Sequence, residues 1–116
     1  MTDWNKATES VEGIKTIKIE LKNSEEIEFN IKIKTGLVPD YLKKMAEFTK
    51  SEDISKIVDY RMDFCKNLIL DADKTAPKDK VALFVETNFA EVIKEISISL
   101  GLAKRKDFET VEEAKN

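Results

Sequence analysis

The sequence predicts an α+β fold in which an N-terminal antiparallel β-hairpin packs on a three-helix, bundle-like C-terminal part. Two observations favour this class. From Ile17 to Ile33, apolar residues alternate with polar ones, which is typical of strands with one buried face. From Leu37 onward, apolar residues recur every three or four positions, as in helices that pack one side on a core. A length of 116 residues suits one such domain.

Three segments are expected along the chain. Residues 1–12 are polar and of mixed charge, so we expect a mobile N-terminal segment whose aromatic residue, Trp4, either stays in solvent or docks on the core. Residues 13–102 hold the single folded domain. Residues 103–116 combine a short basic cluster with an acidic run, which is typical of a flexible charged tail that is solvated or folds on a partner.

The pairing of the two strands follows from parity. The large apolar residues of both strands occupy odd-numbered positions, and directly opposed residues share a face of the sheet. The numbers of paired residues must therefore add to an even sum, which a two-residue loop does not allow. A loop of three or five residues is expected, with Leu21 opposite Ile27 and Ile19 opposite Phe29.

Two amphipathic helices are expected between Gly36 and about Leu70. Pro39 suits the first turn of the first helix, which ends near Lys50, and Ser51 is expected to cap the start of the second. The apolar stripes of the two helices comprise Leu37, Val38, Tyr41, Leu42, Met45, Ala46 and Phe48, and then Ile54, Ile57, Val58, Met62, Phe64, Cys65, Leu68 and Ile69.

Arg61 interrupts the stripe of the second helix. Its aliphatic stem is expected to pack in the core while the guanidinium group reaches an acidic neighbour or solvent. The alternative is that Arg61 faces a partner protein.

The most apolar stretch, Lys80 to Leu100, predicts one long helix closed by Gly101 and Leu102. Its main stripe belongs to the core and comprises Val81, Ala82, Val85, Phe89, Val92, Ile93, Ile96 and Leu100. Two alternatives stay open. Residues 81–85 would also fit a buried strand, and the weak helix formers Thr87 and Asn88 could mark a break.

Three large apolar residues of that stretch, Leu83, Phe84 and Ile98, lie off the main stripe. Either they pack on the hairpin or on other helices of the same chain, or they form an exposed patch that marks an interface. They are the candidate partner-binding residues of the sequence, and an exposed patch there would serve self-association into a homo-oligomer equally well.

The residue pattern predicts no catalytic residue, no cofactor and no metal site. The chain has no histidine, which excludes histidine bases, Ser-His and Cys-His pairs and His-containing metal sites. Cys65 lies on an apolar stripe and is expected to be a buried hydrophobe. Asp71 and Asp73 resemble the start of a calcium loop, but Ala76 and Ala82 stand where its glycine and closing glutamate belong.

Charge and hydropathy favour a cytoplasmic protein with protein partners. The net charge of −3 comes from many charges of both signs, which favours neither nucleic acid nor an anionic membrane as a partner. The N-terminus has no signal-peptide core, and no uncharged apolar run approaches the roughly 20 residues of a membrane span. A single cysteine suits a reducing compartment.

The order of elements resembles a known family over residues 14–102. A lysine-rich hairpin containing Ile17-Lys18-Ile19 and Glu28-Phe29-Asn30-Ile31-Lys32 precedes amphipathic helices, and the last helix leads through Gly101-Leu102 into a charged tail. This is similar to the small tail assembly chaperones of long-tailed (siphovirus-like) phages and prophages. The resemblance implies a viral, non-enzymatic protein of the host cytoplasm that binds tape measure and tail tube proteins, and it supplies no site residues.

Two other functions stay open at this point. One is a small cytoplasmic regulatory adaptor protein, which a pull-down recovering a host factor and no tail component would favour. The other is a histidine-free enzyme, which would need a pocket with converging carboxylates or a lysine.

Overall fold

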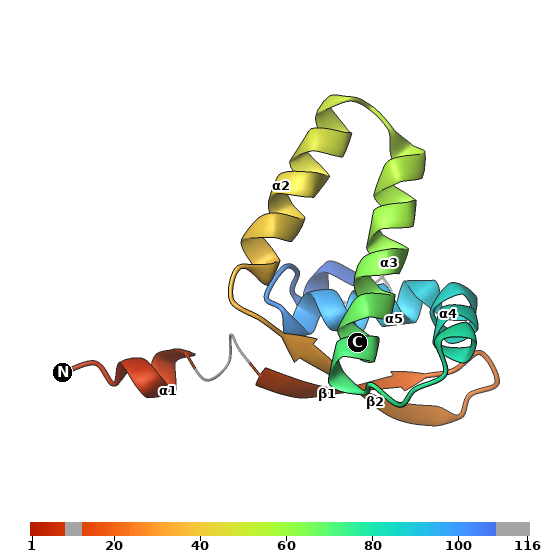
Figure 1. The fold of residues 1–116 in the computed structure, drawn as a ribbon, viewed down its shortest axis with the longest axis horizontal. Helices are drawn as coiled ribbons and strands as arrows, with labels where there is room; N and C mark the ends of the chain where they lie inside the picture. Colours follow the sequence, from red (N-terminus) through yellow and green to blue (C-terminus); the bar gives the residue numbers. More distant parts are fainter. Residues whose placement is uncertain (9–12, 109–116) are drawn as a thin grey trace.

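The computed structural model describes residues 1–8 and 13–108, and within them a two-stranded antiparallel hairpin packs against four longer helices. The elements are α1 (Trp4–Thr8), β1 (Gly13–Glu20), β2 (Glu26–Ile33), α2 (Leu37–Lys50), α3 (Ile54–Ala72), α4 (Lys78–Thr87), α5 (Phe89–Ser99) and a 3-10 turn, η1 (Arg105–Phe108). The hairpin forms the floor, α5 runs along it, and α2 and α3 rise from this base as an upright pair (Figure 1). The α+β class predicted from the sequence is confirmed.

The parity of the hairpin is as expected, but its register is not. Ile19 faces Ile27, whereas Phe29 was the expected partner, so the register differs from the expected one by two residues. The connection is the five-residue loop from Leu21 to Glu25, and the Leu21 N–H donates to the Glu25 carbonyl oxygen at 2.7 Å. This turn bond sets the first pair and, through it, every pair below.

On the solvent side, the observed register sets one opposite-charge pair and one like-charge pair, Glu20 against Glu26, and the expected register would have done the same. Lys18 faces Glu28, with 3.6 Å between Nζ and Oε1, whereas the expected register places Glu20 there. On the other side of the sheet, four isoleucines are buried beneath the helices: Ile17, Ile19, Ile31 and Ile33. A hairpin is marginal alone in water, so this covered face is what holds it in the fold.

A tight turn joins α2 to α3. Glu52 adopts a left-handed conformation with φ of 57°, and its N–H donates to the Thr49 carbonyl at 3.1 Å. The Asp53 N–H donates to the Phe48 carbonyl, also at 3.1 Å. These two bonds form a Schellman-type helix end, which reverses the chain within three residues.

The expected cap of α3 is wrong. Ser51 lies at the C-terminal cap of α2, and its hydroxyl donates to the Phe48 carbonyl. Asp53 caps α3, and its side chain accepts from the Lys56 N–H at 3.1 Å. The reason is that the Schellman turn uses Ser51 and Glu52 to end α2, so α3 starts two residues later than the capping preference of serine suggested.

The single helix expected over residues 80–100 is two helices, α4 and α5. They meet at Asn88, whose backbone N–H and side-chain amide both donate to the Phe84 carbonyl, at 3.0 and 3.1 Å. Asn88 thereby ends α4, and its own carbonyl accepts from Val92 to start α5. The break falls at the weak helix formers noted in the sequence, and residues 81–85 are helical, not a strand.

The core lies where α3, α4 and α5 cover the hairpin. Its buried residues are Ile17, Ile19, Ile31, Ile33, Tyr41, Phe64, Cys65, Leu68, Ile69, Val81, Val85, Val92 and Ile96. The break at Asn88 lets both short helices contribute, since Val81 and Val85 of α4 and Val92 and Ile96 of α5 are all buried. The α5 helix then ends as predicted, with Gly101 at φ 75° and the Leu102 N–H bonded to the Ser97 carbonyl.

Residues 1–6 and 103–108, at the two ends of the described chain, contribute no buried residue to this core. α1 lies away from the body in Figure 1, and Trp4 is 72% exposed, so it is not docked in the core. The tail expected over residues 103–116 begins with η1, while residues 109–116 and residues 9–12 lie outside the described part. Among the described helices, none is both long enough and apolar enough to span a bilayer.

Candidate protein-binding site

The outer half of the α2–α3 pair, residues 42–62, is called the arm here. It contains no buried residue, although the sequence assigned its apolar positions to the same stripes as those of the core. The buried positions of these two helices all lie at the base: Tyr41 on α2, and Phe64, Cys65, Leu68 and Ile69 on α3. In the arm, therefore, apolar residues recur with helical periodicity but are not buried.

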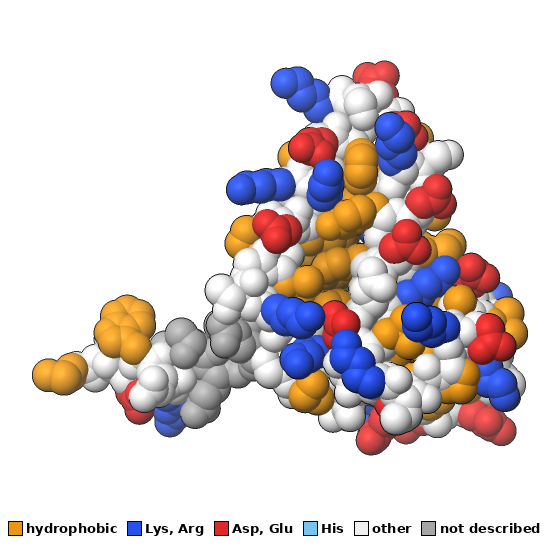
Figure 2. Space-filling model, viewed as in Figure 1, with side chains coloured by type: hydrophobic (Ala, Val, Ile, Leu, Met, Phe, Trp, Pro, Cys, Tyr) orange, Lys and Arg blue, Asp and Glu red, His pale blue; other side chains and the backbone are white. Residues whose placement is uncertain are grey.

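Large apolar side chains are exposed on the arm. Leu42 is 52% exposed, Ile54 is 74% exposed and Val58 is 38% exposed. Figure 2 shows orange side chains between α2 and α3 along much of the upright pair. Exposed apolar residues that follow one another along a helix pair are typical of an interaction surface.

Aromatic contacts hold the two helices of the arm together. The Tyr41 ring lies 4.5 Å from that of Phe64 and 6.1 Å from that of Tyr60, measured between centroids, and Phe48 meets Tyr60 edge-on at 5.8 Å. These rings all project from the side of each helix that faces the other helix. Val58 follows Ile54 by four residues, so both project from the same side of α3, next to this aromatic contact.

A hollow of about 360 Å³ opens at the base of the arm, where α2, α3 and α5 meet the segment that leads into η1. Its walls come from Tyr41, Leu42, Met45, Arg61, Ile93, Lys94, Ser97, Leu102, Ala103 and Phe108. Because Val58 and Ile54 lie three and seven residues before Arg61, the exposed side of the arm continues from this hollow. The hollow together with Leu42, Ile54 and Val58 is called the arm groove.

Arg61 lies in the middle of this groove. Its side chain is exposed, and its Nε–H donates to the Tyr41 hydroxyl at 3.1 Å, so the guanidinium group finds a phenol and not the acidic neighbour that was one of the two expectations. Among the described residues, Arg61 takes part in no ion pair. Its remaining donors are thus available to a carboxylate from outside.

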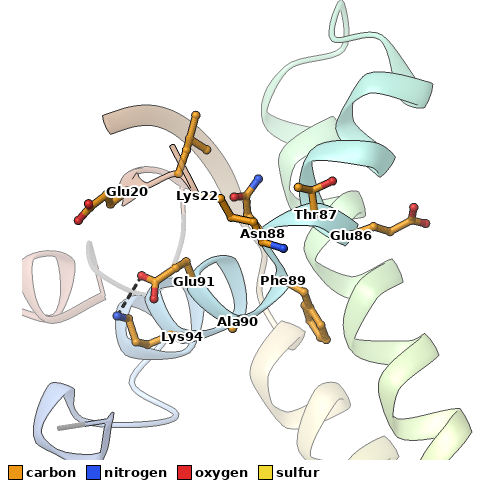
Figure 3. A pocket seen from close by; sticks show the side chains of 10 residues that line it. Glu20, Lys22, Glu86, Thr87, Asn88, Phe89, Ala90, Glu91 and Lys94 are labelled. Carbon is orange, nitrogen blue, oxygen red and sulfur yellow. Dashed lines mark ion pairs between the residues drawn. The ribbon is translucent and has the colours of Figure 1, made fainter. Parts of the chain in front are cut away.

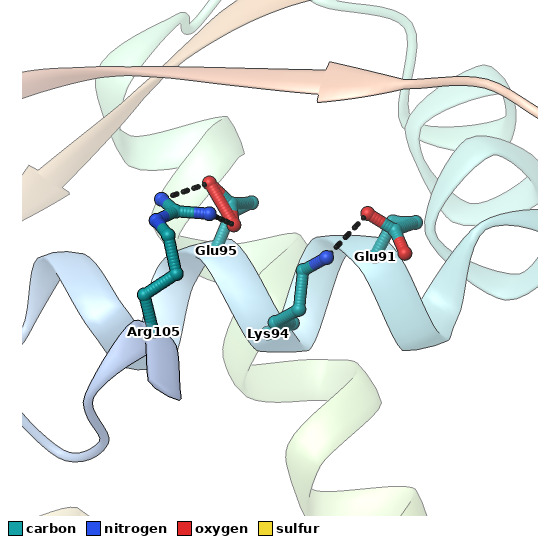
Figure 4. Close-up of polar contacts among 4 residues, drawn as sticks. All are labelled: Glu91, Lys94, Glu95 and Arg105. Atoms are coloured by element: carbon teal, nitrogen blue, oxygen red, sulfur yellow. Dashed lines mark hydrogen bonds and ion pairs between the residues drawn. The ribbon is translucent and has the colours of Figure 1, made fainter. Parts of the chain in front are cut away.

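The lining of the hollow is apolar and basic. It contains two cations, Arg61 and Lys94, and no acidic residue. Lys94 pairs with Glu91 at 3.0 Å on the adjoining face of α5 (Figure 4). The groove therefore suits an apolar segment that also carries a carboxylate.

A bidentate contact positions the far wall of the hollow. Arg105 donates two hydrogen bonds to the Glu95 carboxylate, at 3.0 and 2.8 Å (Figure 4). This contact raises the pKa of the Arg105 guanidinium, chiefly through the hydrogen bond to Glu95. It ties η1 to α5 and so sets Phe108, which is 44% exposed, at the rim of the groove.

The three partner-binding candidates of the sequence do not form one surface of equal exposure. Leu83 is 65% exposed on α4. Phe84 is half-buried and packs edge-on against Phe29 of the hairpin, with 5.4 Å between ring centroids, and Ile98 is half-buried on α5. The prediction that they bind a partner stays a prediction, and Leu83 is the member best placed to do so.

A second, larger hollow of about 580 Å³ lies where the end of β1 meets the junction of α4 and α5 (Figure 3). Its lining mixes three carboxylates with two lysines. Glu86 pairs with Lys66 at 3.2 Å and Glu91 pairs with Lys94 at 3.0 Å, so these two carboxylates already have cationic partners. The ten lining residues include no cysteine, and the chain has no histidine to serve as a base there.

Reactive side chains are not gathered elsewhere in the described residues. Burial raises the pKa of the Cys65 thiol to about 12, so this cysteine stays protonated at neutral pH, as a structural residue does. Residues 1–8 and 13–108 contain no group of three or more cysteine and carboxylate side chains that could hold a metal ion. Asp71 accepts from Lys74 and also pairs with Lys34, and these lysines lower the pKa of its carboxyl group.

Sequence reasoning missed the arm groove because it placed Leu42, Ile54 and Val58 in the core stripes. One signal pointed to it: an arginine in the middle of an apolar stripe marks a place where the stripe reaches solvent or a partner. Phe108 gave no signal, since it was assigned to the tail. No protein-family model, curated protein sequence or solved structure matches this chain.

Proposed function

We propose that the chain is a non-enzymatic protein-binding chaperone of phage tail assembly, which binds tape measure and tail tube proteins. The observation that supports a binding function is the arm groove, where apolar residues of α2 and α3 stay exposed although they continue the stripes of the core. The particular class rests on the family resemblance of residues 14–102.

The groove suits an amphipathic helix of the partner. Two roughly antiparallel helices with exposed apolar positions form the kind of surface on which a third helix lays its apolar face. Arg61 lines the hollow and has no ion-pair partner among the described residues, so the proposed segment has an acidic residue beside its apolar positions. Tape measure and tail tube segments of this composition are the expected ligands.

The first test is genomic and biochemical. A tail tube gene upstream, a tape measure gene downstream and a slippery codon run near the 3′ end support the proposal, and the absence of all three contradicts it. Co-expression of the tagged chain with the neighbouring tape measure and tail tube proteins should then give a complex that survives size-exclusion chromatography. Recovery of a defined host regulator and no tail component would instead make the chain a regulatory adaptor.

The second test locates the binding surface. Leu42→Asp with Val58→Asp should weaken partner binding at least about tenfold, because each substitution places a charge against an apolar partner segment. Leu83→Asp tests the competing candidate surface, since Leu83 is also an exposed leucine on a helix. Loss of binding in the α4 variant, with the arm variant unaffected, would move the site to Leu83 and overturn the arm groove.

A further inference from the structure

The outer edge of β2 presents backbone groups that have no backbone partner in residues 1–8 and 13–108. The bond from Leu21 N–H to the Glu25 carbonyl fixes the alternation of the hairpin, so odd-numbered residues of β2 bond to β1. The even-numbered residues, Glu28, Asn30 and Lys32 among them, direct their N–H and C=O groups outward. No other described segment supplies a backbone partner to them. An edge of this kind is a template for another strand.

The covered face of the sheet is incompletely closed toward the turn end of β2, although Ile31 and Ile33 further along the strand are buried. On β1, Ile17 and Ile19 are each only 3% exposed. On β2, Phe29 is half-buried, and Ile27 is 38% exposed although it points to the same side of the sheet. An added strand would bring apolar side chains next to these two residues.

The charges along the solvent side of β2 are arranged with opposite signs at its two ends. In order they are Glu26, Glu28, Asn30, Lys32 and, just after the strand, Lys34. A strand of this sequence is complementary to itself when it runs antiparallel about its middle residue. We propose that two copies of this chain pair through their β2 edges, with Asn30 at the two-fold axis.

The register of this pairing follows from the same numbers. Glu28 faces Lys32 of the second copy, and Glu26 faces Lys34 of the second copy, so the axis generates four opposite-charge pairs. The even-numbered residues that point outward are then the ones that exchange backbone bonds. On the covered face, Phe29 takes the position opposite the second copy's Ile31, which the second copy's own fold already buries. The two hairpins become one four-stranded sheet with β1 at both outer edges.

The edge of β1 does not offer this complementarity. Its solvent-side residues are Ile14, Thr16, Lys18 and Glu20. Antiparallel pairing of β1 with itself gives at most two opposite-charge pairs, in the register that sets Lys18 against Glu20 of the second copy, whereas the β2 register gives four. The charge pattern therefore favours β2 as the pairing edge and a second copy of the chain as its partner. Pairing about a two-fold axis gives a closed dimer and does not extend into a fibre.

The ion pairs that these residues already make within one copy do not prevent the proposed strand pairing. Glu28 pairs with Lys18 at 3.6 Å, with both side chains 60% exposed, and Lys34 pairs with Asp71 at 3.4 Å. Exposed pairs contribute little and rearrange readily. This dimer goes beyond the proposed function, because it leaves the arm groove of each copy outside the strand pairing.

Two charge variants test the pairing by sedimentation equilibrium. Glu26→Lys with Glu28→Lys gives a wholly basic edge, and Lys32→Glu with Lys34→Glu gives a wholly acidic one. Each variant alone should dimerise at least about tenfold more weakly than the parent chain, because four pairs become like-charged. An equimolar mixture should form a heterodimer, since every pair across the axis is then opposite in sign. This rescue shows that neither variant has simply failed to fold.

Two further measurements decide the matter. Lys104→Glu with Lys106→Glu carries the same change of net charge as the acidic-edge variant, but away from β2, and should dimerise like the parent chain. Amide hydrogen exchange of Glu28, Asn30 and Lys32 should slow as the concentration rises, while that of Thr16 on the outer edge of β1 should not. A chain that stays monomeric at millimolar concentration, or a dimer that both charge variants keep, overturns the proposal.

Discussion

Two isoleucine-to-alanine substitutions test whether the arm is outside the core. Ile96 of α5 and Ile54 of α3 both belong to predicted apolar stripes, yet Ile96 is 0% exposed and Ile54 is 74% exposed. The same atoms are removed in each variant. The difference in the free energy of unfolding therefore reports the burial of the two sites and little else.

The expected magnitudes differ severalfold. Ile96→Ala removes a fully buried side chain and leaves a cavity, which costs about 2–5 kcal/mol. Full burial of an isoleucine contributes about 2 kcal/mol, so Ile54, with about a quarter of its surface covered, loses roughly 0.5 kcal/mol. Because Ile54 is the first residue of α3, the better helix propensity of alanine, which acts in helix interiors, adds little here. Ile54→Ala should thus lower stability by only about 0.5 kcal/mol.

Urea unfolding followed by circular dichroism measures both values on the purified chain. A loss of about 3 kcal/mol for Ile96→Ala would also lower Tm by roughly 10–20 °C in a domain of this size. The outcome that refutes the reasoning is an Ile54→Ala variant destabilised by 2 kcal/mol or more. Such a loss would mean that the arm is packed against the rest of the chain, as its sequence pattern alone suggested.

Two more predictions concern a buried thiol and a strained turn. Cys65 should resist iodoacetamide at pH 8.5 in the folded chain and react promptly in guanidinium chloride. Because burial raises its pKa from 9.0 to about 12, its stabilising effect is complete below pH 9 and is lost as pH rises toward 12, so Cys65→Val should lose less stability between pH 9 and 11 than the parent. Glu52→Gly should stabilise the chain by about 1 kcal/mol in thermal unfolding, since glycine adopts φ of 57° without strain. Ser51→Gly, at φ of −84°, is its control and should give no gain.

The hairpin shows which features of a sheet the alternation of apolar and polar residues can predict and which it cannot. Alternation gave the correct parity, because a side chain on the wrong face would expose isoleucine along the whole strand. It did not give the register, since a shift by two residues keeps every isoleucine on the same face. The observed register is the one that the turn bond between Leu21 and Glu25 closes.

Of the helix ends, one was predicted from the sequence and another was not. Gly101 and Leu102 closed α5 as predicted, because a left-handed residue followed by an apolar one has few other uses after a helix. The α2–α3 turn was not predicted, because Glu52 gives no sign in the sequence that it adopts a left-handed conformation. The backbone strain at Glu52 is offset by the two turn hydrogen bonds that let the chain reverse direction within three residues.

The sequence by itself determined the α+β class, the faces of the strands, the positions of the apolar stripes and the lack of histidine chemistry. Only the tertiary structure decided which parts of those stripes are covered. Periodicity records that a helix has an apolar side, but not whether another element lies against it. The core half of α3 meets the hairpin and is buried, whereas Ile54 and Val58 on the arm continue the same pattern into solvent. That difference turns a predicted core stripe into the proposed binding surface.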